Sequence, residues 1–151
     1  MSTQILFTQH QLHAGVSYSI NDLPTLVQYL RLQLEHNKVV ALTGPLGAGK
    51  TTMVSSLLRS YGIAQEITSP TFTYVNIYHT QAGFTLYHFD LYRIESIDAF
   101  LQAGFDEYLY QPKSLAIIEW PEVIEPLLMH DVCHVALEYD REIDRRMVRI
   151  W

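Results

Sequence analysis

The feature that most constrains this chain is a glycine-rich octapeptide, GPLGAGKT, at residues 44–51. It matches the pattern G-x-x-x-x-G-K-[ST], in which glycines let successive backbone N–H groups turn inward around a phosphate. The pattern has this meaning only between a buried strand and a helix, because the helix adds the positive end of its dipole to the same anion site. The flanking sequence must therefore supply both elements.

Both flanking elements can be read from the sequence. Residues 39–42 (VVAL) form a short apolar run, as expected of a strand buried on both faces. From Thr51 onward a helical spacing places four apolar residues on one side, Val54, Leu57, Leu58 and Tyr61, and Gly62 is suited to end that helix. We therefore expect a phosphate-binding loop (P-loop) in which Lys50 bridges β- and γ-phosphate oxygens and the Thr51 hydroxyl binds Mg²⁺.

A P-loop also needs a carboxylate at the end of a neighbouring strand to hold or orient the magnesium shell. Glu119 directly follows the apolar run 115–118, at the carboxyl edge where α/β sheets place ligands. Asp90 follows the run 84–89, which alternates, contains tyrosine and histidine, and is expected to be half-exposed. Glu119 is thus the candidate for the metal shell, and Asp90 for orienting an attacking water near the γ-phosphate.

The remaining patterns predict one domain over residues 1–151. Further strands are expected at 5–7, 73–79, 84–89, 132–139 and 145–150. The last four form two antiparallel hairpins, the first across residues 80–83. Further helices are expected after Asn21 or Asp22, with Pro24 in the first turn, after Ser96, and from Asp106. The fold class is α/β: a P-loop NTPase-like three-layer sheet of mixed parallel and antiparallel strands with flanking helices.

Composition and charge exclude several classes of protein. Hydrophobic residues make up 48% and charged residues 17%, which does not match a disordered chain. There are 10 Lys and Arg against 16 Asp and Glu, so a positive field that would hold a nucleic-acid backbone is missing, and tRNA is expected to be reached only through a partner. The N-terminus has no basic segment followed by an apolar one, so we expect a cytoplasmic protein that does not enter membranes.

Five sequence blocks, in this order, closely resemble the TsaE family, also called YjeE. They are GPLGAGKTT (44–52), SPTFTYVNIY (69–78), YHFDLYRI (87–94), GFDEYL (104–109) and IIEWPE (117–122). The resemblance implies a small Mg²⁺-dependent ATPase. It is needed, together with TsaD, TsaB and TsaC, for the threonylcarbamoyladenosine modification at position 37 of tRNA, and it acts on the TsaD–TsaB transferase.

The same resemblance implies roles for individual residues. The ATP phosphates are bound by the run Gly47, Ala48, Gly49, Lys50, Thr51 and Thr52. Mg²⁺ is held by Thr51 and Glu119, Trp120 borders the nucleotide, and Asp90 is the catalytic carboxylate, acting with Glu119 and Lys50. Thr71 is implied as a switch-type residue near the γ-phosphate.

One position departs from the family. After the first P-loop glycine the family usually has an acidic residue, whereas this chain has Pro45. Proline stiffens the loop and removes one backbone donor. That donor is not among those nearest the β-phosphate, so we expect phosphate binding to survive.

Two other function classes compete with a partner-dependent ATPase. A small-molecule P-loop kinase needs several arginines and a lid to neutralise the transferring phosphoryl group, and residues 52–113 offer only Arg59 and Arg93. The second competing class is a binding module that depends on a bound nucleotide but hydrolyses it at a negligible rate. Because this central segment has no obvious arginine finger, we expect the isolated chain to hydrolyse ATP slowly until a partner completes or orders the site.

Overall fold

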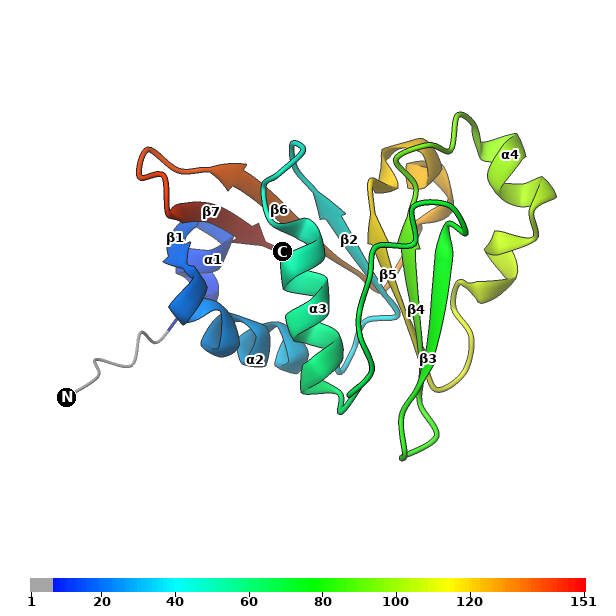
Figure 1. Cartoon of the computed structure of the whole chain (residues 1–151), viewed down its shortest axis with the longest axis horizontal. Coiled ribbons are helices and arrows are strands. Elements are labelled where there is room, and N and C mark those ends of the chain that lie inside the picture. Colours follow the sequence, from blue (N-terminus) through cyan, green and yellow to red (C-terminus); the bar gives the residue numbers. More distant parts are fainter. Residues whose placement is uncertain (1–6) are drawn as a thin grey trace.

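The computed structural model describes residues 7–151. The helices of this part are α1 (Gln9–Ala14), α2 (Leu23–Gln33), α3 (Lys50–Ser60) and α4 (Ile97–Gln102), with 3₁₀ helices η1 (Ile20–Asp22), η2 (Phe105–Tyr108) and η3 (Pro121–Leu127). The strands are β1 (Val16–Ser19), β2 (Val39–Thr43), β3 (Val75–His79), β4 (Thr85–Asp90), β5 (Ser114–Glu119), β6 (Val132–Tyr139) and β7 (Arg145–Ile150). Figure 1 shows their arrangement.

The strands form one sheet with the order β1-β7-β6-β2-β5-β4-β3. Its centre, β6, β2, β5 and β4, is parallel. The outer strands are added antiparallel: β7 on β6, β1 on β7, and β3 on β4. This is the predicted mixed sheet. Because the central strands are parallel, the carboxyl ends of β2, β5 and β4 meet at one edge, where α/β proteins bind ligands.

Two apolar clusters cover the two faces of the sheet. Along β5, Leu115 and Ile117 belong to the cluster that contains the buried faces of α2 and α3. The alternate residues Ala116 and Ile118 belong to the cluster with Phe100 of α4 and the residues around η2 and η3. Figure 1 shows β5, β4 and β3 standing between α3 and α4. The three predicted layers are therefore present, and both apolar strands are buried as expected.

Both predicted hairpins are present, with a later start for the first. β3 begins at Val75, two residues after the expected boundary. The preceding loop closes on itself, since the Tyr74 N–H donates to the carbonyl of Pro70 at 2.8 Å and Tyr74 has a left-handed backbone with φ 64°. That turn ends the 69–74 loop, which lies next to the P-loop.

The N-terminal segment differs from expectation. The strand expected at 5–7 lies outside the described residues except for Phe7, which is in no helix or strand. The structure instead has α1 and β1, neither of which was predicted. A capping box starts α1: the Thr8 hydroxyl accepts from the Gln11 N–H, and the Gln11 side chain accepts from the Thr8 N–H. β1 is defined by its antiparallel pairing with β7 at the other end of the chain, in which Val16 lies opposite Val148 and Ser19 lies opposite Arg145.

The helix expected after Asn21 or Asp22 is α2, with Pro24 in its first turn. Asp22 does not cap it, because its carboxylate accepts from the backbone N–H and the hydroxyl of Ser19, at 2.8 and 2.9 Å. Ser96 caps α4 as predicted. The helix expected from Asp106 is only the 3₁₀ helix η2, and η3 was not predicted.

Candidate phosphate-binding site

The octapeptide forms the loop between β2 and α3, as predicted. Two of its glycines are required by the backbone. Gly44 has φ 145°, and a Cβ atom there would lie 2.3 Å from the carbonyl oxygen of Leu137 in β6. Gly49 has φ 100° and directly precedes α3. A side chain at Gly44 would push the loop off β6, so the glycines fix the loop beside the free N–H groups at the start of α3.

Lys50, the first residue of α3, is 5% exposed and lies over this loop. Its Nζ atom donates to the carbonyl oxygens of Gly44 at 2.6 Å and Pro45 at 2.9 Å. Burial lowers the pKa of Lys50, and the nearby carboxylates Glu119, Glu122 and Asp90 oppose that shift. The loop carbonyls and these carboxylates thus hold an ammonium group at the mouth of the phosphate loop.

Glu119 and Thr51 lie together, as the sequence predicts for a metal pair. Glu119 ends β5, the strand next to β2, and lies opposite Leu42 in the parallel register. The Thr51 hydroxyl donates to Oε2 of Glu119 at 3.0 Å, and Glu119 is only 2% exposed. A hydroxyl and a carboxylate this close are oxygen ligands of the kind that Mg²⁺ takes in nucleotide sites.

Asp90 lies one strand further from the P-loop. It ends β4 directly opposite Glu119 of β5. Its Oδ2 atom accepts from the Ser69 hydroxyl at 2.6 Å, and its Oδ1 atom accepts from the Tyr92 N–H at 3.1 Å. The second candidate carboxylate is therefore fixed at the same sheet edge as Glu119 and is tied to the loop that contains Thr71.

A cavity of about 460 Å³ joins these groups. Predicted site residues that line it are Gly47, Gly49, Lys50, Thr51, Thr52, Thr71, Asp90, Glu119 and Trp120. Ala48 is the exception: its side chain is buried in the α2/α3 cluster, so only its backbone can serve a ligand. The structure thus brings the predicted residues to one hollow, although their roles remain predictions.

Trp120 closes one side of the cavity with an unusual backbone. Its φ of 58° is left-handed, which is uncommon for a residue with a bulky side chain. Its ring lies 4.0 Å from Nζ of Lys50 and 4.9 Å, centroid to centroid, from the ring of Tyr92. Strained backbone conformations of this kind collect at functional sites. Trp120 therefore presents an aromatic face directly beside the loop cation.

Several residues at or near the cavity were not given roles from the sequence, among them Ser69, His88 and Arg93. Ser69 bonds Asp90, His88 lies within hydrogen-bond distance of Glu119, and Arg93 lines the cavity. Arg93, one of the two arginines of the central segment, therefore lines the cavity, and whether it serves as an arginine finger stays a prediction. The guanidinium carbon of Arg93 lies 5.1 Å from the ring centroid of Phe72, which is 82% exposed. Only the fold reveals this, because Arg93 reaches the site through the loop after β4.

The expectation that β4 is half-exposed is also wrong in part. β4 is paired along both edges, with β3 and β5, and Leu86, His88 and Phe89 are buried in it. The alternation in sequence reflects two different covering layers rather than one solvated face.

A second cavity of about 190 Å³ opens on the other side of the P-loop. Gly49 and Thr52 line it together with Tyr18 at the end of β1 and with Ile143 and Arg146 of the β6–β7 hairpin. The hairpin contacts the loop directly, since the hydroxyl of Tyr139 donates to the carbonyl of Leu46. The unpredicted strand β1 and the tail hairpin therefore build a wall of the phosphate loop.

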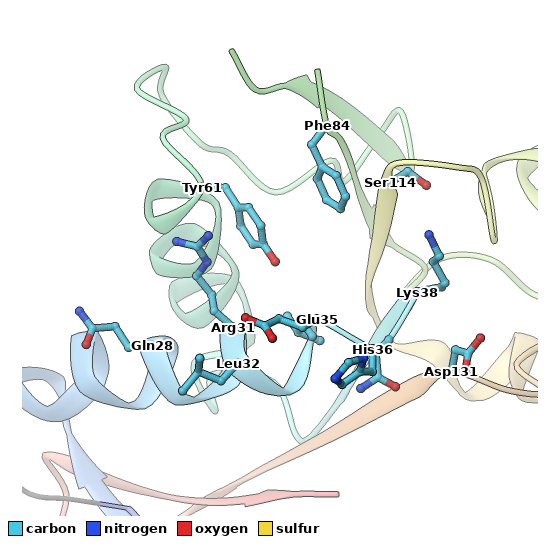
Figure 2. Close-up of a pocket in the computed structure, with 12 residues that line it drawn as sticks. Gln28, Arg31, Leu32, Glu35, His36, Lys38, Tyr61, Phe84, Ser114 and Asp131 are labelled. Atoms are coloured by element: carbon cyan, nitrogen blue, oxygen red, sulfur yellow. The ribbon is translucent and has the colours of Figure 1, made fainter. Parts of the chain in front are cut away.

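A larger hollow of about 680 Å³ lies at the opposite edge of the sheet, where β2 and β5 begin (Figure 2). Figure 2 shows Arg31 of α2 and Glu35, just after that helix, below the rings of Tyr61 and Phe84. The two rings are stacked with centroids 5.9 Å apart, and Arg31 lies over Tyr61 and donates to the carbonyl of Ser60. The lining of the 680 Å³ hollow includes no residue of the P-loop, so this hollow is separate from the candidate phosphate site.

Comparison with known proteins agrees with the motifs. Residues 17–148 match the family model described as "Threonylcarbamoyl adenosine biosynthesis protein TsaE". A tRNA threonylcarbamoyladenosine biosynthesis protein TsaE from Treponema pallidum is 46% identical over 89 residues, 59% of this chain and 64% of that protein. Another from Rickettsia felis is 40% identical over 114 residues, 75% of this chain and 65% of that protein. The matches thus span a little under two thirds of these relatives.

The fold also resembles a solved structure. A crystal structure of YdiB from Bacillus subtilis matches with a TM-score of 0.63 and 25% sequence identity, covering 89% of this chain and 82% of that one. Within residues 7–151, no helix is long and apolar enough to cross a membrane.

Proposed function

The chain belongs to the TsaE family, and on that premise we propose that it is a Mg²⁺-dependent ATP hydrolase in the biosynthesis of threonylcarbamoyladenosine on tRNA. The observation that carries the proposal is the 3.0 Å hydrogen bond between Thr51 at the start of α3 and Glu119 at the end of β5. It joins a hydroxyl of a phosphate loop to a buried carboxylate, which is the donor set for magnesium bound to a nucleotide.

In this proposal the loop backbone and Lys50 bind the phosphates. The N–H groups at the start of α3 and the glycine-rich turn face the anion, and the Lys50 ammonium leaves the carbonyls of Gly44 and Pro45 for phosphate oxygens. Thr51 and Glu119 hold Mg²⁺, which when bound neutralises charge on the β- and γ-phosphate oxygens. The cavity beside Gly49 and Thr52 offers room for the nucleoside, and Trp120 borders the phosphates.

Asp90 is the proposed group that orients the attacking water. Its carboxylate lies at the same edge as Glu119, and Ser69 and the Tyr92 backbone already hold both of its oxygens in place. A carboxylate fixed in this way accepts a hydrogen bond from water and aims it, as a water-positioning residue must.

TsaD and TsaB are the proposed partners, and tRNA is reached through them. The net charge of −6 argues against direct tRNA binding. The loop around Thr71 carries the exposed Phe72, and Arg93 lies against that ring at the cavity wall. A partner that contacts Phe72 would therefore order the loop and move Arg93 toward the γ-phosphate, where an arginine stabilises developing charge. A cytoplasmic location is part of this proposal.

The kinase alternative is the less favoured one. Arg59 lies in the last turn of α3, at the opposite end from the P-loop. Arg93 lines the cavity with the carboxylates, and Arg146 lines the cavity beside Gly49 and Thr52. A phosphoryl-transferring kinase uses several arginines together with a lid.

The Thr51–Glu119 pair gives the experiment that tests the proposal. Thr51→Val keeps the side-chain shape but removes the hydroxyl, and we expect it to weaken Mg²⁺-dependent ATP binding at least tenfold, since even outer partners of metal ligands are worth about 10- to 100-fold. Calorimetric titration with ATP, with and without Mg²⁺, measures this. Thr85→Val, at the opposite edge of the sheet in β4, is the matched control. Equal Mg²⁺ dependence in both variants would contradict the metal assignment.

A further inference from the structure

One buried polar side chain next to the site has no part in the scheme above. His88 lies in β4 and is fully buried, and its Nε2 atom is 3.2 Å from Oε1 of Glu119. Its other ring nitrogen, Nδ1, has no hydrogen-bond partner in the part of the chain that the structure describes. A buried polar atom without a partner costs free energy, so packing alone would favour an apolar residue at this position.

The contact with His88 completes the hydrogen bonding of Glu119. Oε2 of Glu119 accepts from the Thr51 hydroxyl, and Oε1 lies against His88. Rotation of the carboxylate would break both contacts. Residues two apart on a strand face the same side, so His88 and Asp90 project from one face of β4, His88 to contact Glu119 and Asp90 to line the cavity.

We propose that His88 is a positioning residue that donates its Nε2–H to Glu119 and so keeps the other carboxylate oxygen facing Thr51 and the magnesium position. The inference rests on the proposed function, because this orientation matters only if Glu119 serves a metal. An ionised carboxylate can only accept, so the ring proton must be on Nε2. The unpartnered Nδ1 is then a lone pair, not an unsatisfied N–H donor.

The tautomer can be measured without nucleotide. Long-range ¹H–¹⁵N NMR spectra of histidine-labelled protein distinguish the two neutral tautomers, and His88→Gln identifies the signal by its loss. We expect the tautomer of His88 that carries its proton on Nε2. A ring with its proton on Nδ1 would overturn the proposal, because Nε2 would then face a carboxylate as a second acceptor.

The functional effect is measured as the Mg²⁺ concentration that gives half-maximal binding of a non-hydrolysable ATP analogue. We expect His88→Leu to raise it at least tenfold, within the range of about 10- to 100-fold known for outer-shell partners. Leu86→Val is the matched control, since Leu86 is buried on the same face of β4 and has no polar contact with Glu119. The proposal would be overturned if the Mg²⁺ concentration for half-maximal binding were the same in His88→Leu as in Leu86→Val.

Conservative variants keep the test decisive if His88→Leu does not fold. Glutamine places an amide N–H near the position of Nε2, whereas asparagine places it near Nδ1. We expect His88→Gln to bind at lower Mg²⁺ than His88→Asn, and equal values would contradict a donor role at Nε2. A wild-type chain that binds the analogue without regard to Mg²⁺ would instead overturn the proposed function itself, whatever the variants show.

Discussion

Lys50 is the residue whose loss should affect nucleotide binding most. Its side chain is buried, and its ammonium group donates to two loop carbonyls and lies over the Trp120 ring. Lys50→Ala should abolish productive ATP binding because no other side-chain cation is aimed at the β- and γ-phosphates from the P-loop. The fold should survive, since burial already lowers the pKa of Lys50 and disfavours its charge. Calorimetric titration checks the loss of ATP binding, and a thermal melt checks that the variant still folds. Unchanged ATP affinity in a folded variant would refute the assignment of the phosphate-binding loop.

The two carboxylates should respond differently to truncation. Glu119 touches Thr51, so Glu119→Ala should weaken Mg²⁺-nucleotide binding. Asp90 touches the Ser69 loop, so Asp90→Ala should leave binding nearly intact and lower turnover. Parallel measurements of binding and single-turnover hydrolysis separate these effects. Two variants that both bind and hydrolyse Mg·ATP normally would leave neither role standing.

At the scale of elements, one half-buried arginine adds side-chain hydrogen bonds between β1 and the tail hairpin to the backbone pairing of β1 with β7. Arg145 donates through Nε to the Ser17 hydroxyl at 2.7 Å and through Nη2 to the Ser17 carbonyl at 2.9 Å. Charge-assisted hydrogen bonds are worth about 1.5–3 kcal/mol each, and partial exposure reduces that. Arg145→Ala should therefore lower the free energy of unfolding by about 1–3 kcal/mol, measured by urea denaturation.

Arg149 provides the control for that prediction. It lies in the same strand, β7, but its ion pair with Glu138 is exposed at both ends. Exposed pairs contribute about 0–1 kcal/mol, so Arg149→Ala should change stability little. If Arg145→Ala and Arg149→Ala lower the free energy of unfolding equally, the hydrogen bonds from Arg145 to Ser17 do not provide the predicted stabilisation.

The elements that the sequence predicts best are those with strong local patterns. The two apolar strands, β2 and β5, the two hairpins and α3 all follow from hydrophobic period, turn residues and caps. β1 and α1 were missed because β1 exists through pairing with β7, at the other end of the chain, and α1 is six residues long. Asp22 looked like a helix cap, yet Ser19 takes its carboxylate.

The candidate site shows the same division. The P-loop and both carboxylates follow from residue type and position at strand ends. Arg93, Ser69 and His88 reach the site only because β4 lies beside β5 in the sheet, an order that local patterns do not specify. His88 looked like part of a half-exposed strand because the sequence does not reveal the helix layer that covers it.

At the scale of the whole molecule, the parallel centre of the sheet gathers Thr51, Asp90 and Glu119 at one edge, while the net charge stays negative. We expect such a protein to bind Mg·ATP at that edge, and its negative net charge disfavours direct contact with tRNA. Arg93, which lines the cavity that holds the two candidate carboxylates, lies against the exposed ring of Phe72. Slow hydrolysis alone and faster hydrolysis with a partner follow from this arrangement.

Steady-state phosphate release at fixed Mg·ATP, while the TsaD–TsaB complex is titrated in, tests this account most directly. Arginines placed on the γ-phosphate are worth about 10³- to 10⁵-fold in other P-loop enzymes, so partial ordering of the site should be easy to detect. We predict slow release by the chain alone and at least a tenfold rise, about 1.4 kcal/mol of barrier, as the complex forms. A flat titration under conditions where gel filtration shows the complex, or fast release by the chain alone, would contradict it.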